Sequence, residues 1–260
     1  MASMKKLTNT SINFLPIVAV LLILAIWQAI SFFQIIPEFL LPSPLSVLEV
    51  FKSDYSALFS NSLVTLIEAF WGLCFGVLLG VGLALIMDLF HPIYKALYPL
   101  LVITQTIPTV AIAPLLILWF GYGILPKVVL VVATTFFPIA VGMLDAFRST
   151  DKDLITLMRT LGANTPKIYF YIKFPDAIDS FFASLKISVS YSLVGAVVSE
   201  WVGGFNGLGV YMTRVMKAYA YDKMFAVIFL ISILSLALIL LVNWIQYLIT
   251  PWRRTNHAQA

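Results

Sequence analysis

Long apolar runs without a charged side chain dominate this sequence. Asp, Glu, Lys and Arg are all absent from residues 14–33, 69–87, 96–125, 128–144 and 224–252. A helix needs about 20 apolar residues to cross the hydrocarbon core of a bilayer. Five membrane-spanning helices are therefore predicted directly. Only 11% of the residues are charged, where soluble domains carry about 25%, so a water-soluble fold is excluded.

A sixth span is expected where the apolar pattern is weaker. Residues 177–199 include Asp179 and Lys186, but a lysine near the interface can extend its ammonium group to water. The sequence thus predicts an all-α polytopic membrane protein with about six transmembrane helices in a single domain over residues 1–260. The expected spans are residues 14–33, 63–87, 96–120, 126–147, 177–199 and 224–250.

Basic residues predict the orientation, because cytoplasmic loops carry more Lys and Arg than external loops do. With the N-terminus inside, ten basic residues fall in cytoplasmic segments and five in external ones, and Lys186 stays in its span. Both termini are therefore expected in the cytoplasm. The cytoplasmic set is Lys5, Lys6, Lys95, Arg148, Lys152, Arg159, Lys167, Lys173, Arg253 and Arg254. The external set is Lys52, Lys127, Arg214, Lys217 and Lys223.

Several classes of chemistry lack the residues that they need. The basic residues are spread along the chain, so the net charge of +4 does not predict nucleic-acid binding. Cys74 is the single cysteine, and His91 and His257 lie far apart, so neither a metal site nor a catalytic residue is predicted. The phosphate-binding pattern G-x-x-x-x-G-K-[ST] is absent as well. We expect a chain that is not an enzyme and binds no cofactor of its own.

The third apolar run is interrupted by Pro99, Pro108 and Pro114. Each proline removes a helical hydrogen bond, so the span over residues 96–120 is expected to bend or break. Non-helical backbone at membrane depth is tolerated where protein or a water-filled cavity covers it. Two interpretations remain open: a span beside a translocation pathway, or a kinked helix packed on its neighbours.

Two carboxylates lie within or next to apolar spans. Glu68 is one turn into the second span, and Glu200 is at the outer end of the fifth. Acids in such positions are costly and usually face a cavity or a partner, which makes both candidates for the outer half of a pathway. The alternative is a place in interfacial water or a pairing with a basic neighbour. Glycines four residues apart in the second span predict a packing seam: Gly72, Gly76 and Gly80.

A long cytoplasmic connection, residues 148–175, has the pattern of two short helices. Asp151 and Asp153 favour the start of the first helix, and Gly162 favours its end. Pro166 opens a second piece, before Phe174-Pro175 leads into the membrane. The apolar residues that share one face of the first helix are Leu154, Leu157, Met158 and Leu161. An apolar face on the cytoplasmic side predicts a protein partner.

This connection resembles the cytoplasmic signature of permease subunits of bacterial ATP-binding-cassette (ABC) importers of the binding-protein-dependent kind. That signature reads E-A-A, three residues, G, nine residues, I-x-L-P. The spacing from the glycine to the proline is the same here, and Thr-Leu-Met replaces E-A-A. On this resemblance, the residues expected to couple the chain to an ATPase are Thr156, Leu157, Met158, Leu161, Gly162, Ala163, Ile172 and Pro175.

Two further stretches extend the resemblance over nearly the whole chain. Residues 105–123 are similar to the P-x-x-A-x-x-P-L…W-F-G-x-G run of the nitrate, sulfonate, taurine and thiamine-precursor branch. Glu200 followed by Gly207-Leu208-Gly209 is similar to the E…G-L-G element of that branch. The resemblance implies a type I ABC importer transmembrane domain in a bacterial inner membrane, working by alternating access. It also implies a second, identical permease, cytoplasmic ATPase subunits that hold ATP and magnesium, and an external substrate-binding protein.

The acid at position 68 guides the expected choice of solute. A carboxylate beside a pathway repels anions at low effective dielectric, so Glu68 favours a neutral or weakly basic solute. Within the branch, this points to a thiamine-pyrimidine precursor or a similar aromatic heterocycle such as riboflavin. The same machine importing sulfonate, taurine or nitrate is the alternative, and a secondary transporter or a membrane scaffold is the alternative of another class. The candidate pathway residues are Glu68, Thr104, Gln105, Thr106, Pro108, Trp119 and Glu200.

Overall fold

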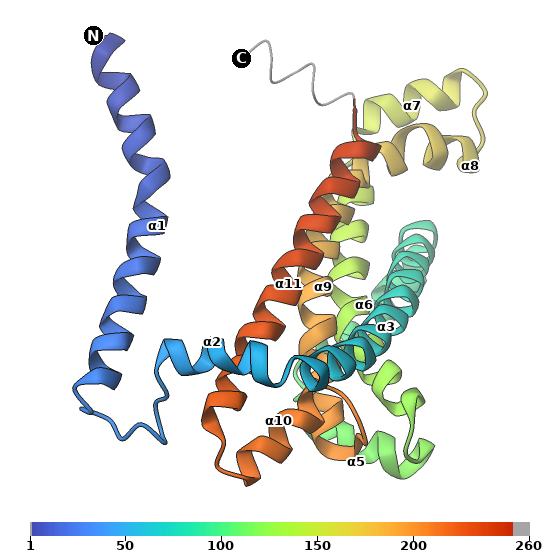
Figure 1. The fold of residues 1–260 in the computed structure, drawn as a ribbon. Helices are drawn as coiled ribbons and strands as arrows, with labels where there is room; N and C mark the ends of the chain where they lie inside the picture. Colours follow the sequence, from blue (N-terminus) through green and yellow to red (C-terminus); the bar gives the residue numbers. More distant parts are fainter. Residues whose placement is uncertain (1, 252–260) are drawn as a thin grey trace. The chain divides into compact units, whose positions relative to one another are not determined.

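The computed structural model describes residues 2–251, with side chains from residue 14 onward, and is almost wholly helical (Figure 1). The described residues fall into two compact units. The first combines the residues up to Phe59 with Met212–Leu230, and the second combines Ser60–Tyr211 with the residues from Ile231 onward. The single domain over residues 1–260 stays a prediction. So does the orientation, because four basic residues used for it lie outside the described side chains: Lys5, Lys6, Arg253 and Arg254.

Five helices of the described chain are long and apolar enough to cross a bilayer, and the bent pair described below makes a sixth if it forms one span. The expected all-α membrane fold with about six spans is confirmed. Each of the other five predicted spans lies within one helix, and no span extends more than one residue beyond the end of that helix. The five helices are α1 (Ala2–Phe32), α3 (Tyr55–Leu89), α6 (Ile124–Ser149), α9 (Phe174–Gly203) and α11 (Tyr221–Ile249).

The third predicted span, residues 96–120, is not one helix. It consists of α4 (His91–Thr104) and α5 (Thr109–Phe120), which meet at an angle of 99°. Helical conformation is disfavoured for a residue that precedes a proline, and Ile107 precedes Pro108 at this break. Pro108 then serves as the N-cap of α5. The other two prolines lie inside α4 and α5 without ending them.

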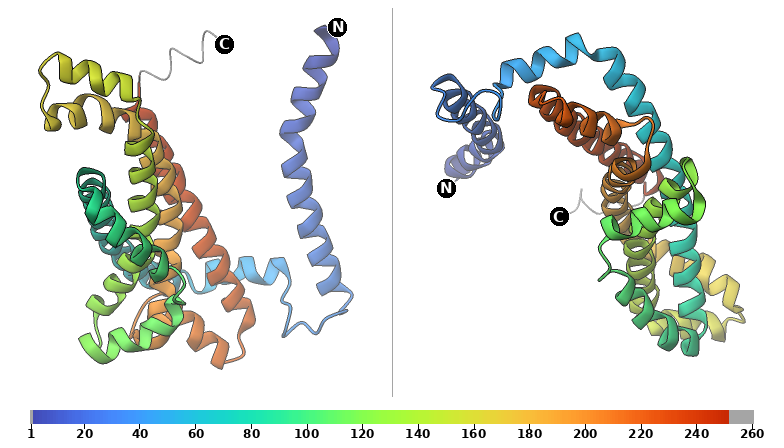
Figure 2. Two further views of the ribbon diagram at one scale, coloured as in Figure 1. Left: turned by 180° about the vertical axis from the view of Figure 1, so that it is seen from behind. Right: turned by 90° about the horizontal axis from the view of Figure 1, so that it is seen from below.

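The core of the second unit forms where α3 and α9 pack against α6. α6 and α9 run side by side (Figure 2), and the Ser188 hydroxyl donates a hydrogen bond of 2.8 Å to the Thr135 carbonyl between them. The predicted glycine seam of α3 lies against α6. A Cβ atom added to Gly80 would come within 2.7 Å of the Phe136 carbonyl oxygen and 2.9 Å of Ile139 Cβ. The seam therefore lets two helices of the same chain approach closely.

The connection between α6 and α9 begins with α7 (Lys152–Thr160), which projects with α8 (Thr165–Ile168) from one end of α6 and α9 (Figure 1). Asp151 caps α7 by accepting a 2.8 Å hydrogen bond from the Asp153 N–H. The chain then turns at Gly162, whose φ of 81° favours glycine.

The second predicted piece of this connection, residues 167–172, is not a separate helix. α8 continues through a π-helical turn, η1 (Tyr169–Lys173), into α9 without a break. The wider turn suits Pro175, which has no N–H to donate and whose ring would crowd the carbonyl four residues earlier in a regular α-helix.

The first unit is held by contacts around α1. The Trp27 indole N–H donates a 3.1 Å hydrogen bond to the Pro42 carbonyl, and its ring stacks on Phe229 at 5.6 Å. The helix α2 (Pro44–Ser53) follows, and Lys223 of α11 forms a 2.6 Å ion pair with Asp54 at its end. The remaining helix, α10 (Leu208–Lys217), joins the two units along the chain.

Candidate functional site

The break between α4 and α5 borders a hollow of about 470 Å³, whose other walls come from α6 and α9. Two predicted pathway residues, Thr104 and Gln105, line it. None of its lining residues is charged. Its polar or hydroxyl-bearing side chains are Thr104, Gln105, Thr109, Thr134 and Tyr191, and its apolar surface comes from Ile107, Ile112, Ala133, Phe136, Val194 and Gly195. Neutral polar groups on an apolar surface are typical of a small-molecule site.

Two hydroxyl groups donate hydrogen bonds to backbone carbonyls at the break, and one of these carbonyls, that of Ile103, also accepts the Thr106 N–H. Thr104 donates a 2.6 Å hydrogen bond to the Leu101 carbonyl, and Thr106 donates one of 2.8 Å to the Ile103 carbonyl. Non-helical backbone at membrane depth requires such partners. The amide group of Gln105 is exposed at the same place and donates only a long contact, 3.3 Å, to the Thr104 hydroxyl. It is the group most available to a solute.

The other pathway candidates do not line this hollow. Thr106 and Pro108 belong to the break but are not among the residues that line the hollow, and Trp119, near the end of α5, is 68% exposed. Glu68 and Glu200 are both buried within the chain. The structure therefore separates the seven candidates into two residues that line the polar hollow, two exposed residues of the break that do not line it, an exposed aromatic side chain and a pair of buried acids.

Glu68 of α3 forms an ion pair with Lys127 of α6, with 2.5 Å between Oε1 and Nζ. The two side chains are only 3% and 8% exposed. Of the alternatives left open by the sequence, the structure shows the pairing with a basic residue. Sequence reasoning had placed Lys127 in an external connection. The sequence nevertheless marks Lys127 as unusual, because it is the one charged residue between residues 96 and 144.

Glu200 organises the turn that follows α9. Its carboxylate accepts hydrogen bonds from the Thr65 hydroxyl, at 2.7 Å, and from the Gly209 N–H, at 2.5 Å. Thr65 in turn accepts a 2.9 Å hydrogen bond from the Leu208 N–H. The glutamate and the Gly-Leu-Gly sequence seven residues later thus belong to one hydrogen-bonded unit, since buried N–H groups of a turn need acceptors.

The helix α7 presents the predicted apolar face to its surroundings. No residue of α7 is buried, and Leu157 is 56% exposed. Leu154 and Leu161 are exposed too, whereas Met158 is half-buried. An exposed row of large apolar side chains on a short helix marks a surface for a partner.

A set of contacts that the sequence did not reveal joins η1, at the end of the α6–α9 connection, to α3. Tyr169 and Lys173 of η1 both donate to Asp88 near the end of α3, the lysine at 2.5 Å. Tyr169 also packs edge-to-face on Phe147 of α6, with ring centroids 5.6 Å apart. The only sequence signal was the position of Asp88, directly after an uncharged run. Its partners, 81 and 85 residues away, are brought to it by the tertiary fold.

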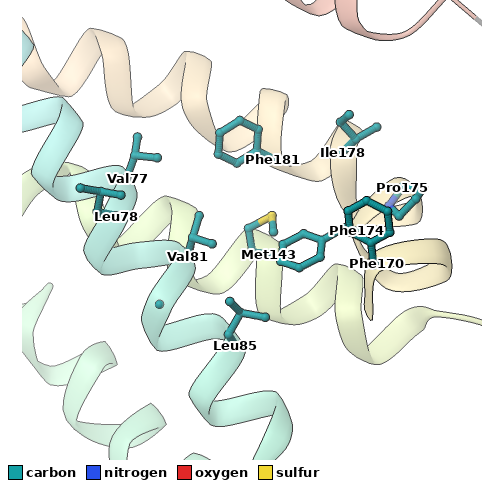
Figure 3. Close-up of a pocket in the computed structure, with 11 residues that line it drawn as sticks. Val77, Leu78, Val81, Leu85, Met143, Phe170, Phe174, Pro175, Ile178 and Phe181 are labelled. Carbon is teal, nitrogen blue, oxygen red and sulfur yellow. The ribbon is translucent and has the colours of Figure 1, made fainter. Parts of the chain in front are cut away.

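A second cavity, of about 800 Å³, lies between α3, α6 and the beginning of α9 (Figure 3). All of its lining residues are apolar or glycine. Figure 3 shows Val77 and Val81 of α3 on one side and Ile178 and Phe181 of α9 on the other. Pro175 is the only predicted site residue among them. A purely apolar lining favours hydrocarbon chains over polar molecules. The polar hollow is therefore the better candidate for binding a polar solute.

Sequence comparison identifies the family to which this arrangement belongs. A family described as binding-protein-dependent transport system inner membrane component matches residues 72–255. This chain belongs to that family. It is a permease subunit of an ABC importer, and the resemblance seen in the sequence is confirmed.

Individual relatives extend the match to almost the full length of this permease. The formylaminopyrimidine transport permease protein ThiX of Halalkalibacterium halodurans is 35% identical over 92% of this chain and 96% of that protein. The riboflavin transport system permease protein RibX of Chloroflexus aurantiacus is 31% identical over 90% of this chain and 88% of that protein. Permeases named for aliphatic sulfonates or taurine also match, at 25% or 26% identity.

The fold has a solved counterpart. The inward-facing MetNI methionine ABC transporter contains a chain with a TM-score of 0.64 and 20% identity, covering 74% of this permease and 96% of that chain. At this identity the likeness concerns the fold alone. It agrees with the assignment of the permease to the transmembrane domains of ABC importers.

Proposed function

We propose that this permease imports a thiamine-pyrimidine precursor or a similar aromatic heterocycle such as riboflavin. The names of two relatives above 30% identity, ThiX and RibX, support this choice. The observation that carries it is the polar hollow at the α4–α5 break. Its volume of about 470 Å³ is large enough for a small ring system, and no charged residue lines it.

The chemistry of the hollow fits a flat, neutral, nitrogen-containing ring. Phe136 and Tyr191 offer aromatic faces, and Gln105 offers both an amide donor and a carbonyl acceptor. A pyrimidine presents ring nitrogens that accept and amino groups that donate hydrogen bonds. The side chain of Gln105 can serve both kinds of group without any change of charge.

The proposed machine contains two copies of this permease and two cytoplasmic ATPase subunits, which hold ATP and magnesium. An external binding protein delivers the solute. The exposed apolar face of α7 is the proposed ATPase contact, together with the following residues up to Pro175. ATP-driven closure of the ATPases then moves this contact and reorients the spans around the pathway.

An anionic solute is a second candidate because the structure removes the argument against it. Glu68 is paired with Lys127 rather than facing a pathway as a free acid. Its charge therefore gives no reason to reject a sulfonate, taurine or nitrate. Relatives named for sulfonates and taurine support this alternative, although their identity to this chain is lower than that of ThiX and RibX.

Uptake by the reconstituted complex tests the proposal. Vesicles containing the permease, its ATPase and its binding protein are offered labelled hydroxymethylpyrimidine, riboflavin, taurine and nitrate. We expect ATP-dependent accumulation of a heterocycle. Accumulation of taurine or nitrate alone would reject our choice of solute, and uptake without ATP would favour a secondary transporter.

A pair of variants tests whether the solute binds in the polar hollow. Gln105→Leu removes the exposed amide from the hollow, so we expect weaker uptake of the heterocycle. Thr106→Ser is the matched control, because Thr106 lies next in the chain but does not line the hollow, and serine keeps the hydroxyl that binds the Ile103 carbonyl. Equal uptake by the two variants would argue against the hollow as part of the pathway.

A further inference from the structure

Three ionisable side chains that meet near the ends of α6 and α9 are almost completely buried. Glu68 is 2% exposed, Glu200 is 1% exposed and Lys127 is 6% exposed. Glu200 accepts a hydrogen bond from Thr65, which lies one turn before Glu68 on α3, so the two carboxyl groups lie close to each other and to Lys127. Two acids and one base are therefore enclosed together, from α3, α6 and α9.

The charges in this cluster do not balance if every group is ionised. Two carboxylates and one ammonium group would leave one excess negative charge, in a region of low dielectric. Burying an uncompensated charge costs several kcal/mol even after relaxation. Among the described side chains, Lys127 is the only cation that forms an ion pair with either acid.

The hydrogen bonds of the cluster leave one oxygen without a partner. Glu68 Oε1 is bound to Lys127, and both oxygens of Glu200 accept hydrogen bonds, from Thr65 and Gly209. Glu68 Oε2 is buried and has no hydrogen-bond partner within the described chain. Buried polar atoms are rarely left in this state. Its neighbour, Glu200, has no hydrogen to donate while it is ionised.

We propose that Glu68 and Glu200 share one proton, so that their cluster with Lys127 is electrically neutral. A single proton between the two carboxyl groups removes the excess charge and gives Glu68 Oε2 its missing hydrogen bond. Two neighbouring carboxyl groups are the usual setting for such a shared proton, because both cannot ionise at close range. The site is independent of the solute and does not rest on the proposed function.

Infrared spectroscopy of the complete transporter in lipid at neutral pH tests this site. The chain has only four glutamates, Glu38, Glu49, Glu68 and Glu200. Labelling the glutamate carboxyl groups of this subunit with ¹³C therefore reports on few residues. We expect one carbonyl band of a protonated carboxylic acid that shifts with the label and again in heavy water.

Variants assign the band to the pair. Glu68→Gln and Glu200→Gln should each abolish it, because one remaining carboxylate balances Lys127 and needs no proton. Glu38→Gln and Glu49→Gln are the controls, because both side chains are exposed, and the band should persist in them. No labelled band in the unmodified protein, or a band that survives both Glu68→Gln and Glu200→Gln, would overturn the proposal. The measurement on the unmodified protein stands even if a variant fails to fold.

Discussion

At the scale of single residues, the buried acids have a different role from the one their sequence positions indicate. Glu68 is predicted from sequence to select the charge of a solute, but Lys127 neutralises it inside the helix bundle. Glu200 holds the N–H of Gly209 and is linked through Thr65 to Leu208. These contacts join α3, α6, α9 and the turn after α9. The acids therefore link helices within the bundle, and in the proposed function the solute contacts neutral groups.

Replacing Lys127 by methionine should destabilise the permease strongly. The change leaves the cluster without its cation, and breaking a buried ion pair by removing one partner costs about 3–5 kcal/mol. Thermal unfolding of the purified complex in detergent measures the effect. Lys223→Met is the matched control, because the Lys223–Asp54 pair is more exposed and such pairs contribute about 0–1 kcal/mol. Similar losses in both variants would contradict the assigned role of Lys127.

At the scale of the helices, η1 connects the proposed ATPase contact to the membrane bundle. The chain runs from α8 through this turn into α9 without interruption, and Asp88 fixes the turn to the end of α3. A displacement of η1 would therefore move both α9, with which it is continuous, and α3, to which it is bound. Packing of Tyr169 on Phe147 adds α6 to the same joint. We propose that this joint transmits movement of the loop to the membrane bundle.

The substitution Asp88→Asn tests this joint. It removes the charge that holds Lys173 and weakens the contact with Tyr169. Hydrogen bonds to charged groups contribute about 1.5–3 kcal/mol, so uptake should fall by roughly tenfold or more while ATP hydrolysis continues. The ratio of ATP hydrolysed to solute imported measures the coupling. Asp145→Asn is the control, because Asp145 is an exposed acid of α6, and its ratio should stay unchanged.

A charge on the exposed face of α7 tests the proposed ATPase contact. Leu157→Glu places a carboxylate on that face, so we expect loss of ATP-dependent uptake and weaker co-purification of the ATPase. The fold should persist because the side chain is 56% exposed. Thr160→Glu adds the same charge beside the apolar face and should have a smaller effect. Normal uptake by the Leu157 variant would reject the docking assignment.

At the scale of the whole molecule, we propose that the polar hollow is one part of the translocation pathway. Gln105 and its neighbours are exposed, although they lie in a segment that the sequence places in the membrane. Polar groups at that depth need cover by protein or water. A second copy of the permease, with its own hollow facing the first, supplies this cover in the proposed assembly.

Cross-linking tests this arrangement. Cys74 is the only cysteine, so Cys74→Ser gives a cysteine-free background. Gln105→Cys in that background should form a dimer with a short thiol-reactive cross-linker in native membranes. Leu118→Cys is the control, since Leu118 of α5 is 77% exposed but does not line the hollow. Cross-linking at position 118 and not at 105 would place the second copy elsewhere.

Much of the fold was predictable because the bilayer imposes a length and a polarity on each span. Five of the six predicted spans lie within one helix each, and none extends more than one residue beyond it, although several helices are longer than the span. Asp151, Gly162 and an apolar row predicted α7. Pro108 indicated the broken third span. These signals are local, since hydrogen bonding within a helix and transfer from water to lipid depend on neighbouring residues alone.

The contacts between helices could not be read in the same way. Lys127 and Glu68 are 59 residues apart, and Asp88 meets Tyr169 and Lys173 across more than 80. A lone charge in an apolar run shows that a partner is needed, but not which residue it is. Only the packing of α3, α6 and α9 decides this, because it sets which charges are enclosed together. The sequence by itself determined a permease of about six spans, and the tertiary structure decided that Glu68 pairs with Lys127 and that Glu200 binds Thr65 and Gly209.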